Sequence, residues 1–490
     1  MRIICRADGN SEIGLGHLYR MVAIADFYIG QYDVVFVTSE RSELSVIPSK
    51  FVVDVIPQDI SLEHEAKWLS KNYSQATDII VFDGYQFVSS YQKAIKSFSF
   101  KSIYIDDNAT EYMYADIVVN PASISESIIY KGEPYTEHVF GSKYSMLRPR
   151  FYDLAGQARP LETLKSVFIC FGGSDPLNLT ILATKAVLML ENQFETIDVV
   201  LGSANISVEL FALASENNKL TVHKSLNETE LVDVMLSCDL AIVPASTISY
   251  ELCCLNMVIL AGYYVQNQKL IYDSLVATNT IFGCGDFTDY SIADFENKLI
   301  ELLEVRDWET KLSNQSRLFD GKSKYRFLSL IDRLNMSFRK VNEDDLTLLY
   351  NWSNNKVVRE NSYNKSEISF ADHSQWFLRK LSDSNSLVLI AIINEKESGT
   401  IRYEFDTDST TVGISISEEF RGRNLGSTML RQSAIKYVET ICFPVLAFIK
   451  VENDASVRAF KCAGYKFYRN EVVKGANSYV YKLEKENVCK

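Results

Sequence analysis

The chain has 490 residues, 47% of them apolar and 23% charged, which excludes a disordered or fibrous protein. At roughly 150 residues per domain, this length predicts about three folding units, and the lack of any apolar run of roughly 18 residues predicts no membrane span. The net charge of −13 is uneven: the first 335 residues carry 28 basic against 43 acidic side chains, which argues against a nucleic-acid partner.

The first 335 residues alternate short β-rich apolar runs with stretches of helical spacing. Near-continuous apolar strands separated by helices are typical of parallel sheets covered on both faces. Two sets of strands occur, each long enough for one doubly wound α/β domain, and we expect the two Rossmann-like domains to face each other across a cleft. The strands are expected at 2–5, 33–38, 51–56, 78–82, 102–105 and 116–119, and then at 166–171, 196–201, 220–223, 239–243 and 258–261.

The charge balance changes near residue 335, where 22 basic and 20 acidic residues follow. We therefore expect domains at 1–152, 153–334 and 336–490, with the first two connected through 148–160. The last part reads as a mixed α+β unit, with helices and strands in irregular alternation. Its helices are expected at 344–352, 370–381, 427–440 and 455–463, and its strands at 387–393, 399–405, 411–416, 445–451, 465–470 and 478–483.

A glycine loop follows the first strand and runs from Asp8 through Gly14 and Gly16 to His17. Glycines allow a ligand to approach the backbone, and a helix start offers free N–H donors to an anion. The positive end of the helix dipole favours a neutral imidazole at His17, which could act as a base. The alternative is a histidine that only caps or packs the turn; the flanking glycines favour the functional reading.

Acidic residues also follow two further strands, with Asp83 after one and Asp106 and Asp107 after the next. At the carboxyl ends of parallel strands such side chains would face the cleft, and Asp83 is a candidate catalytic residue. Each could equally cap the helix that follows, which aspartate does well.

The second domain repeats this pattern. Gly172 and Gly173 end a strand, and Ser246 and Thr247 end another, so backbone and hydroxyl donors there could bind a diphosphate. Glu251 lies one turn further and could accept from ribose hydroxyls. Each group could be local turn chemistry, but their occurrence at successive strand ends favours a nucleotide site. Asn267 and Gln268 extend the series.

These segments resemble the UDP-sugar hydrolase of pseudaminic acid biosynthesis, and they are also similar to the lipid II-forming N-acetylglucosaminyltransferase. The resemblance implies a glycosyltransferase-B arrangement, cleavage of a UDP-linked 2,4-diacetamido-2,4,6-trideoxy-altropyranose by water that His17 activates, UDP held by the second domain with Glu251 at the ribose, and no metal. One departure is that 243–245 replaces the family's glycine-rich turn. The matching segments are 14–17, 105–107, 115–120, 141–149, 171–175, 246–251 and 267–268.

A basic glycine-bearing turn follows the strand at 411–416 and precedes a helix, and backbone N–H groups of such a turn can wrap a pyrophosphate. The alternative is a solvated basic turn. Together with a second motif at 451–465, the turn resembles the GNAT N-acetyltransferase family, which implies acetyl-CoA as co-substrate. The residues that the resemblance places at acetyl-CoA are Ile414, Ile416, Arg421, Gly422, Arg423, Asn424, Leu425, Gly426, Ser427, Asn453 and Ser456.

Two positions of this unit depart from that family. Asn424 replaces the usual glycine, but asparagine tolerates positive φ well enough to keep the loop. Phe460 replaces the tyrosine that often protonates the thiolate, so another group or water must do so. His373 or Glu404 could accept the amine's proton through water, although the aromatic helix around His373 fits a structural role equally well.

The two resemblances predict a bifunctional enzyme of pseudaminic acid biosynthesis that acetylates the 4-amine of a UDP-amino sugar and then hydrolyses the product. The rivals are a glycosyltransferase with an appended acetyltransferase, and a GNAT unit that binds acetyl-CoA without catalysis. Nine cysteines with no CxxC pair, and five histidines without metal spacing, predict reduced thiols in a cytoplasmic protein without a metal. UDP, the UDP-amino sugar and acetyl-CoA are the expected partners, with no membrane; the sequence leaves the oligomeric state and the sugar stereochemistry open.

Overall fold

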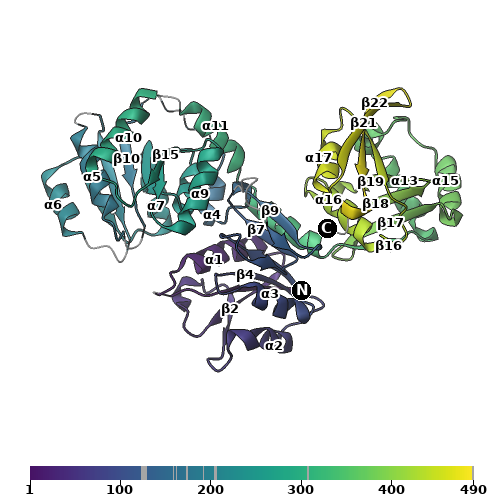
Figure 1. The fold of residues 1–490 in the computed structure, drawn as a ribbon, viewed down its shortest axis with the longest axis horizontal. Coiled ribbons are helices and arrows are strands. Elements are labelled where there is room, and N and C mark those ends of the chain that lie inside the picture. Colours follow the sequence, from purple (N-terminus) through teal and green to yellow (C-terminus); the bar gives the residue numbers. More distant parts are fainter. Residues whose placement is uncertain are drawn as a thin grey trace. The chain divides into compact units, whose positions relative to one another are not determined.

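The computed structural model describes residues 1–10, 12–122, 130–157, 159, 161, 163–172, 175–190, 193–202, 207–305 and 308–487. The chain divides into two compact units, Met1–Phe327 and Leu328–Lys490 (Figure 1). The first unit contains two large parallel sheets and the second a mostly antiparallel sheet.

The first sheet has seven strands in the order β3-β2-β1-β4-β5-β7-β9, all parallel. Its strands are nearly continuous apolar runs with both faces covered, as expected for a doubly wound domain. The short strands β6 and β8 form a separate two-stranded parallel sheet. The strands are β1 (Arg2–Ala7), β2 (Asp33–Ser39), β3 (Val52–Ile56), β4 (Ile79–Asp83), β5 (Lys101–Ile105), β6 (Tyr112–Met113), β7 (Ile117–Asn120), β8 (Lys131–Gly132) and β9 (Glu137–Phe140).

The second sheet has six parallel strands in the order β12-β11-β10-β13-β14-β15, the order of the doubly wound nucleotide-binding fold. Alternate residues of β10 enter different cores: Val167 packs on the α5, α6 and α10 side, and Phe168 on the α4, α7 and α8 side. The strands are β10 (Ser166–Ile169), β11 (Thr196–Leu201), β12 (Leu220–Lys224), β13 (Leu240–Pro244), β14 (Val258–Tyr263) and β15 (Phe282–Asp286).

Helices connect the strands of both sheets, so each sheet presents the carboxyl ends of its strands to the loops that start helices. The α-helices of the first unit are α1 (Gly16–Tyr28), α2 (Leu62–Asn72), α3 (Ser89–Ser97), α4 (Pro149–Leu154), α5 (Leu179–Met189), α6 (Val208–Glu216), α7 (Glu228–Ser237), α8 (Thr247–Cys254), α9 (Gln266–Ala277), α10 (Ile292–Val305), α11 (Glu309–Leu318) and α12 (Ser323–Leu334), the last of which continues into the second unit.

The second unit has one seven-stranded sheet, β16-β17-β18-β19-β20-β22-β21. Only β19 and β20 are parallel, and they pair at Thr410 and Thr411 alone before they separate. Figure 1 shows α16 and α17 on one side of this sheet and α13 and α15 on the other. The elements are β16 (Ser337–Lys340), α13 (Leu346–Ser353), α14 (Lys356–Asn361), α15 (Phe370–Ser382), β17 (Ser386–Ile393), β18 (Lys396–Phe405), β19 (Thr410–Ile416), α16 (Leu425–Lys436), β20 (Val445–Lys450), α17 (Asp454–Cys462), β21 (Lys466–Val473) and β22 (Ala476–Leu483).

The expected α/β fold class with parallel-sheet domains is confirmed, and every strand expected from the sequence is present to within a few residues. The sequence did not predict β9, β15 and β16, nor the two-residue strands β6 and β8. β9 and β15 close the edges of the parallel sheets, and β15 contains two glycines, which weaken the strand pattern.

Candidate functional site

The loop after β1 is held by Asp8. One oxygen of its carboxylate accepts from Ser39 N at 2.7 Å, Thr38 Oγ1 at 3.1 Å and Ser42 Oγ at 3.2 Å, and it pairs with the buried Arg6. Burial would raise the pKa of Asp8, but Arg6 and the Ser39 donors outweigh it and hold this pKa well below its usual value. Asp8 therefore fixes the loop against β2 as an anion, whether or not it also meets a substrate.

His17 lies on the first turn of α1 and meets the end of β4. Its Nδ1 is 2.7 Å from Asp83 Oδ1, and Asp83 is fully buried. Burial would raise the pKa of Asp83, but the charge of Arg20 and the hydrogen bonds from His17 and Arg20 hold it below its usual value. Nδ1 also lies 3.0 Å from Arg20 Nη2, which can only donate, but its shorter contact is with a carboxylate that can only accept. A hydrogen on Nδ1 satisfies that shorter contact and leaves Nε2 of a neutral ring with its lone pair.

Arg20, one turn along α1, completes this cluster. Its Nε and Nη2 donate to the two oxygens of Asp83 at 2.9 and 2.7 Å, and its Nη1 donates to both oxygens of Asp107 at 2.7 and 2.6 Å. The sequence reasoning missed Arg20, although its spacing of three residues from His17 places both on one helix face. Asp107 thus pairs with an arginine, while Asp106 accepts from Tyr130 OH and Ala109 N.

The ring of His17 packs against an aromatic ring, and two glycines precede this histidine in the chain. Its ring meets that of Tyr85 edge to face, with centroids 4.7 Å apart. Gly14 has φ of 84°, and a Cβ added to Gly14 or Gly16 would meet no atom within 4 Å. The loop beside His17 is therefore free of packed side chains, and a neutral imidazole held by a carboxylate there can accept a proton from water.

In the second sheet, the turn after β10 is closed by its own carboxylate. Asp175 accepts from Leu179 N and Thr180 N, both at 2.9 Å, so it occupies the donors at the start of α5. Gly172 has φ of 86°, as a tight turn requires, and the predicted Gly173 lies outside the described residues. The helix α5 begins only at Leu179, three residues after Pro176.

The turn after β13 is open. Ser246 is the N-cap of α8 without a side-chain cap bond, and in the described part of the chain neither its hydroxyl nor that of exposed Thr247 has a hydrogen-bond partner. Glu251, one turn on, is buried, and its two oxygens accept from Arg148 Nε and Nη2 at 2.9 Å each. Burial raises the pKa of Glu251, and Arg148 opposes that rise.

The two predicted amides at the start of α9 differ in role. Asn267 is exposed, and its Nδ2 lies 3.4 Å from Tyr85 OH, the ring that packs on His17. Gln268 is buried, and its Oε1 accepts from Tyr264 N at 3.1 Å. Gln268 thus braces the turn before α9, whereas the Asn267 amide lies within the surroundings of the histidine.

In the second unit, the loop before α16 has the conformation expected from the sequence. Gly422 and Asn424 both have positive φ, 78° and 55°, so the expectation that asparagine can replace glycine there is confirmed. The guanidinium of Arg421 donates to Ile416 O and Asn355 Oδ1, and that of Arg423 to Glu419 O and Asp332. Both arginines are thus held by protein groups.

The strand before this loop separates from β20, which exposes backbone groups of β19 along the gap. Ile414 and Ile416 reach the start of α16, where a Cβ on Gly426 would lie 3.5 Å from the Ile416 side chain and 3.3 Å from Ala459. Gly426 therefore permits close packing of α16 on α17, and Leu425 beside it is buried.

The second motif is partly local structure. Asn453 caps α17, because its Oδ1 accepts from Ser456 N at 3.1 Å. At the start of α16, Ser427 Oγ lies 3.4 Å from Asn424 O. Phe460 is buried against Tyr465, with ring centroids 4.9 Å apart. Burial raises the pKa of Tyr465 well above its usual value, so its phenol stays protonated.

The two predicted proton acceptors of this unit lie in different surroundings. His373 is 2% exposed, packs against the rings of Tyr350 and Trp376, and burial lowers its pKa. Glu404 is half-exposed and pairs with Lys380 and Arg402 at 3.3 and 3.2 Å. Neither geometry singles out a base.

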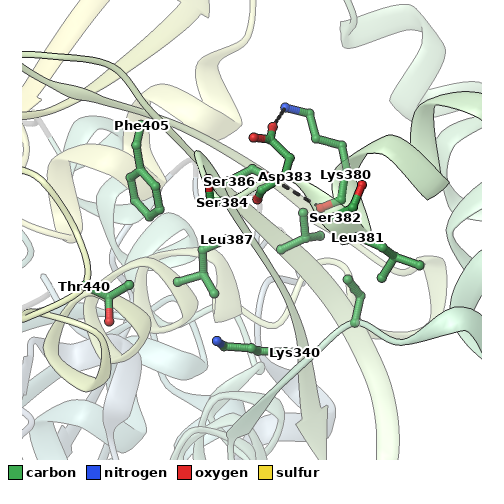
Figure 2. Close-up of a pocket in the computed structure, with 12 residues that line it drawn as sticks. Lys340, Lys380, Leu381, Ser382, Asp383, Ser384, Ser386, Leu387, Phe405 and Thr440 are labelled. Atoms are coloured by element: carbon green, nitrogen blue, oxygen red, sulfur yellow. Dashed lines mark hydrogen bonds and ion pairs between the residues drawn. The ribbon is translucent and has the colours of Figure 1, made fainter.

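Lys380 lines a cavity of about 310 Å³ and pairs with Asp383, another residue of its lining (Figure 2). Its lining comes from the starts of β17 and the ends of β16, α15 and β18, and contains none of the predicted site residues. Among the described residues, no group of His, Cys, Asp and Glu could hold a metal ion, and no helix is long and apolar enough to cross a membrane.

Comparison with known proteins matches the N-terminal and C-terminal parts of the chain to different proteins. Residues 335–466 match the model of the acetyltransferase (GNAT) domain. The UDP-2,4-diacetamido-2,4,6-trideoxy-beta-L-altropyranose hydrolase of Campylobacter jejuni is 24% identical over 277 residues, 55% of this chain and 94% of that protein. The spore coat polysaccharide biosynthesis protein SpsG of Bacillus subtilis is 25% identical over 268 residues, 54% of this chain and 77% of that protein.

A relative with the same extent also exists. The uncharacterized protein MJ1062 of Methanocaldococcus jannaschii is 24% identical over 514 residues, 99% of this chain and 100% of that protein. The N-terminal part of the chain is thus homologous to the hydrolase and to SpsG, and a GNAT domain follows it, so the chain joins two enzyme-related parts.

Proposed function

We propose that the chain is a bifunctional nucleotide-sugar enzyme of pseudaminic acid biosynthesis. The second unit transfers an acetyl group from acetyl-CoA to the 4-amine of a UDP-4-amino-4,6-dideoxy sugar. The first unit then hydrolyses the resulting UDP-2,4-diacetamido-2,4,6-trideoxy-altropyranose to UDP and the free sugar. The relative from Campylobacter and the GNAT domain support these two steps, each for its own half of the chain.

The contact that carries the hydrolytic half is the 2.7 Å approach of His17 Nδ1 to the buried Asp83 carboxylate. With Nδ1 as donor, Nε2 takes a proton from water, and the water oxygen bonds to the anomeric carbon. The bond from that carbon to the phosphate oxygen breaks, and UDP leaves with the electron pair. Asp83 stabilises the imidazolium that forms, as carboxylates beside catalytic histidines do.

The leaving UDP requires donors for its phosphates. In our proposal the open turn at Ser246 and Thr247 supplies them, because α5, the other helix start, has its donors taken by Asp175. Glu251 would then accept from a ribose hydroxyl with the carboxylate lone pairs that Arg148 leaves free. This use of both sheets corresponds to a glycosyltransferase-B arrangement, which is part of the proposal.

The acetyl-transfer half rests on the separated strands β19 and β20 and on the loop from Gly422 to Gly426 at the start of α16. Acetyl-CoA would lie with its pantetheine arm along β19 and its pyrophosphate at the loop's N–H groups. The amine nitrogen attacks the thioester carbonyl, the C–S bond breaks, and CoA leaves as a thiol after gaining a proton. Phe460 cannot supply that proton, so water or another group must.

Incubation with acetyl-CoA and candidate UDP-4-amino sugars, followed by mass spectrometry, tests both steps. We expect a UDP-sugar that gains one acetyl group, then free UDP and a diacetamido sugar without any added acceptor. UDP release only when an acceptor sugar is present would instead indicate a glycosyltransferase, and the absence of CoA release would indicate a GNAT unit that binds without catalysis.

A further inference from the structure

Two side chains of α12 hold the loop that precedes α16. Ser329 Oγ donates to the backbone carbonyl of Arg423, and Asp332 Oδ2 accepts from Arg423 Nη1 at 3.1 Å. Both residues belong to the unit Leu328–Lys490, yet both precede residue 335, where the match to the GNAT domain begins. The helix that ends just before the GNAT match therefore contacts the loop assigned to acetyl-CoA.

In these contacts the two residues of α12 are buried, whereas the arginine of the loop is partly exposed. Ser329 and Asp332 are 3% and 4% exposed, whereas the Arg423 side chain is 41% exposed. Burial raises the pKa of Asp332, and Arg423 opposes that rise, so the ion pair favours the charged carboxylate. A buried carboxylate that loses its partner is costly, which keeps Arg423 at this position.

The bond from Ser329 also sets the direction of a backbone donor. A trans peptide unit is planar, so its carbonyl and the N–H of the next residue point in opposite directions. Because the Arg423 carbonyl points to Ser329, the Asn424 N–H points away from α12. Leu425 and Gly426 follow in the first turn of α16, where helical N–H groups lack backbone partners. One hydrogen bond thus orients the first of several donors of the loop.

The same part of the chain is tied to the body of α16. Gln432 Nε2 donates to Arg333 O at 3.1 Å, and Lys436 Nζ donates to Phe338 O at 2.9 Å. The connector from α12 to β16 therefore runs along α16 and contacts it at two further points.

We propose that Ser329 and Asp332 are positioning residues for acetyl-CoA, which hold the 422–426 loop with its N–H donors aimed at the ligand's pyrophosphate. The inference rests on the acetyl-CoA site proposed above. In this proposal the second half of α12 supports the acetyl-CoA site, although the helix begins within the unit Met1–Phe327.

The test uses the full chain and CoA itself as the probe, with Kd from calorimetry and KM and kcat from thiol release. We expect Asp332→Asn to weaken CoA binding about tenfold, since it removes the charge of the ion pair, and Ser329→Ala about threefold, since it removes one neutral hydrogen bond. The KM for acetyl-CoA should rise in parallel, while kcat at saturation stays within about twofold. Matched controls are Asp408→Asn, an exposed carboxylate without an ion pair in the described chain, and Ser374→Ala, whose hydroxyl bonds within its own helix.

The outcomes separate the two proposals. If the unmodified protein does not bind CoA, the acetyl-CoA site itself is wrong. If it binds and both variants match their controls, the site stands and the positioning role is wrong. Tighter binding by Asp332→Asn would also overturn it, because Asp332 would then compete with the ligand for Arg423. If Asp332→Asn fails to fold, by thermal unfolding and UDP release, Ser329→Ala decides alone.

Discussion

His17 and His373 are both candidate bases in the sequence, each a lone histidine at a helical position, and the structure places them in opposite surroundings. His17 lies at a strand end with Nδ1 on the buried Asp83 and its ring beside a glycine loop. His373 lies among Tyr350, Trp376 and Phe377, and its buried Nε2 has no hydrogen-bond partner in the described chain. A histidine is suited to act as a base where a carboxylate orients it and one nitrogen stays open, and only the first site meets both conditions.

The largest expected effect that sharpens this contrast is at His17. His17→Ala should lower UDP release from the acetylated sugar by about 10²- to 10⁴-fold, the usual contribution of a general base. Acetyl transfer by the same protein should stay unchanged, because the other unit performs it. Coupled assays of UDP and of free thiol measure both rates in one sample, and a parallel loss of both would contradict the assignment.

The next effect is at the carboxylate that orients His17. Asp83→Asn should lower the kcat of UDP release by roughly 10²-fold, since an amide can donate to Nδ1 and stabilise the wrong tautomer. The KM should change little, because Asp83 is fully buried and cannot touch the substrate. An increase in KM without a change in kcat would mean that Asp83 only shapes the pocket.

At His373 we expect an effect on stability. Burial lowers its pKa, so the unfolded chain binds a proton below about pH 6.5 that the folded chain does not. This histidine's contribution is thus complete above pH 6.5 and is lost as the pH falls through that value. His373→Phe should remove this loss. The free energy of unfolding of the variant minus that of the parent should therefore increase from pH 7 to pH 5. A difference that is constant with pH would contradict a neutral buried ring.

The smallest effect is on the activity of that variant. His373→Phe keeps the aromatic packing with Trp376 and should leave the rate of acetyl transfer within about twofold of the parent. Thiol release at saturating acetyl-CoA and acceptor measures it. A loss of 10²-fold or more would make His373 the base and would remove the contrast between the two histidines.

The sequence could predict the strands because buried parallel strands are apolar runs, and it could predict His17 and Asp83 because both lie where strands end. It could not show which residues meet across long separations. Arg148 and Glu251 are 103 residues apart in the chain, and Arg20 and Asp107 are 87 apart.

The two helix starts of the second sheet show the same limit. Asp175 and Ser246 are both good N-cap residues, and only the structure shows that the first closes its turn and the second does not. The role of α12 at the 422–426 loop has no sequence signal at all, because the contact joins elements on either side of an apparent domain boundary.

Hydrolysis in water enriched with oxygen-18 tests the central claim most directly. If water, activated at His17, attacks the anomeric carbon, the carbon–oxygen bond breaks and the released UDP carries no label. Mass spectrometry of that UDP therefore gives the answer, with the parent enzyme and the acetylated UDP-sugar. Label in the terminal phosphate of UDP would mean attack at phosphorus and would contradict the account.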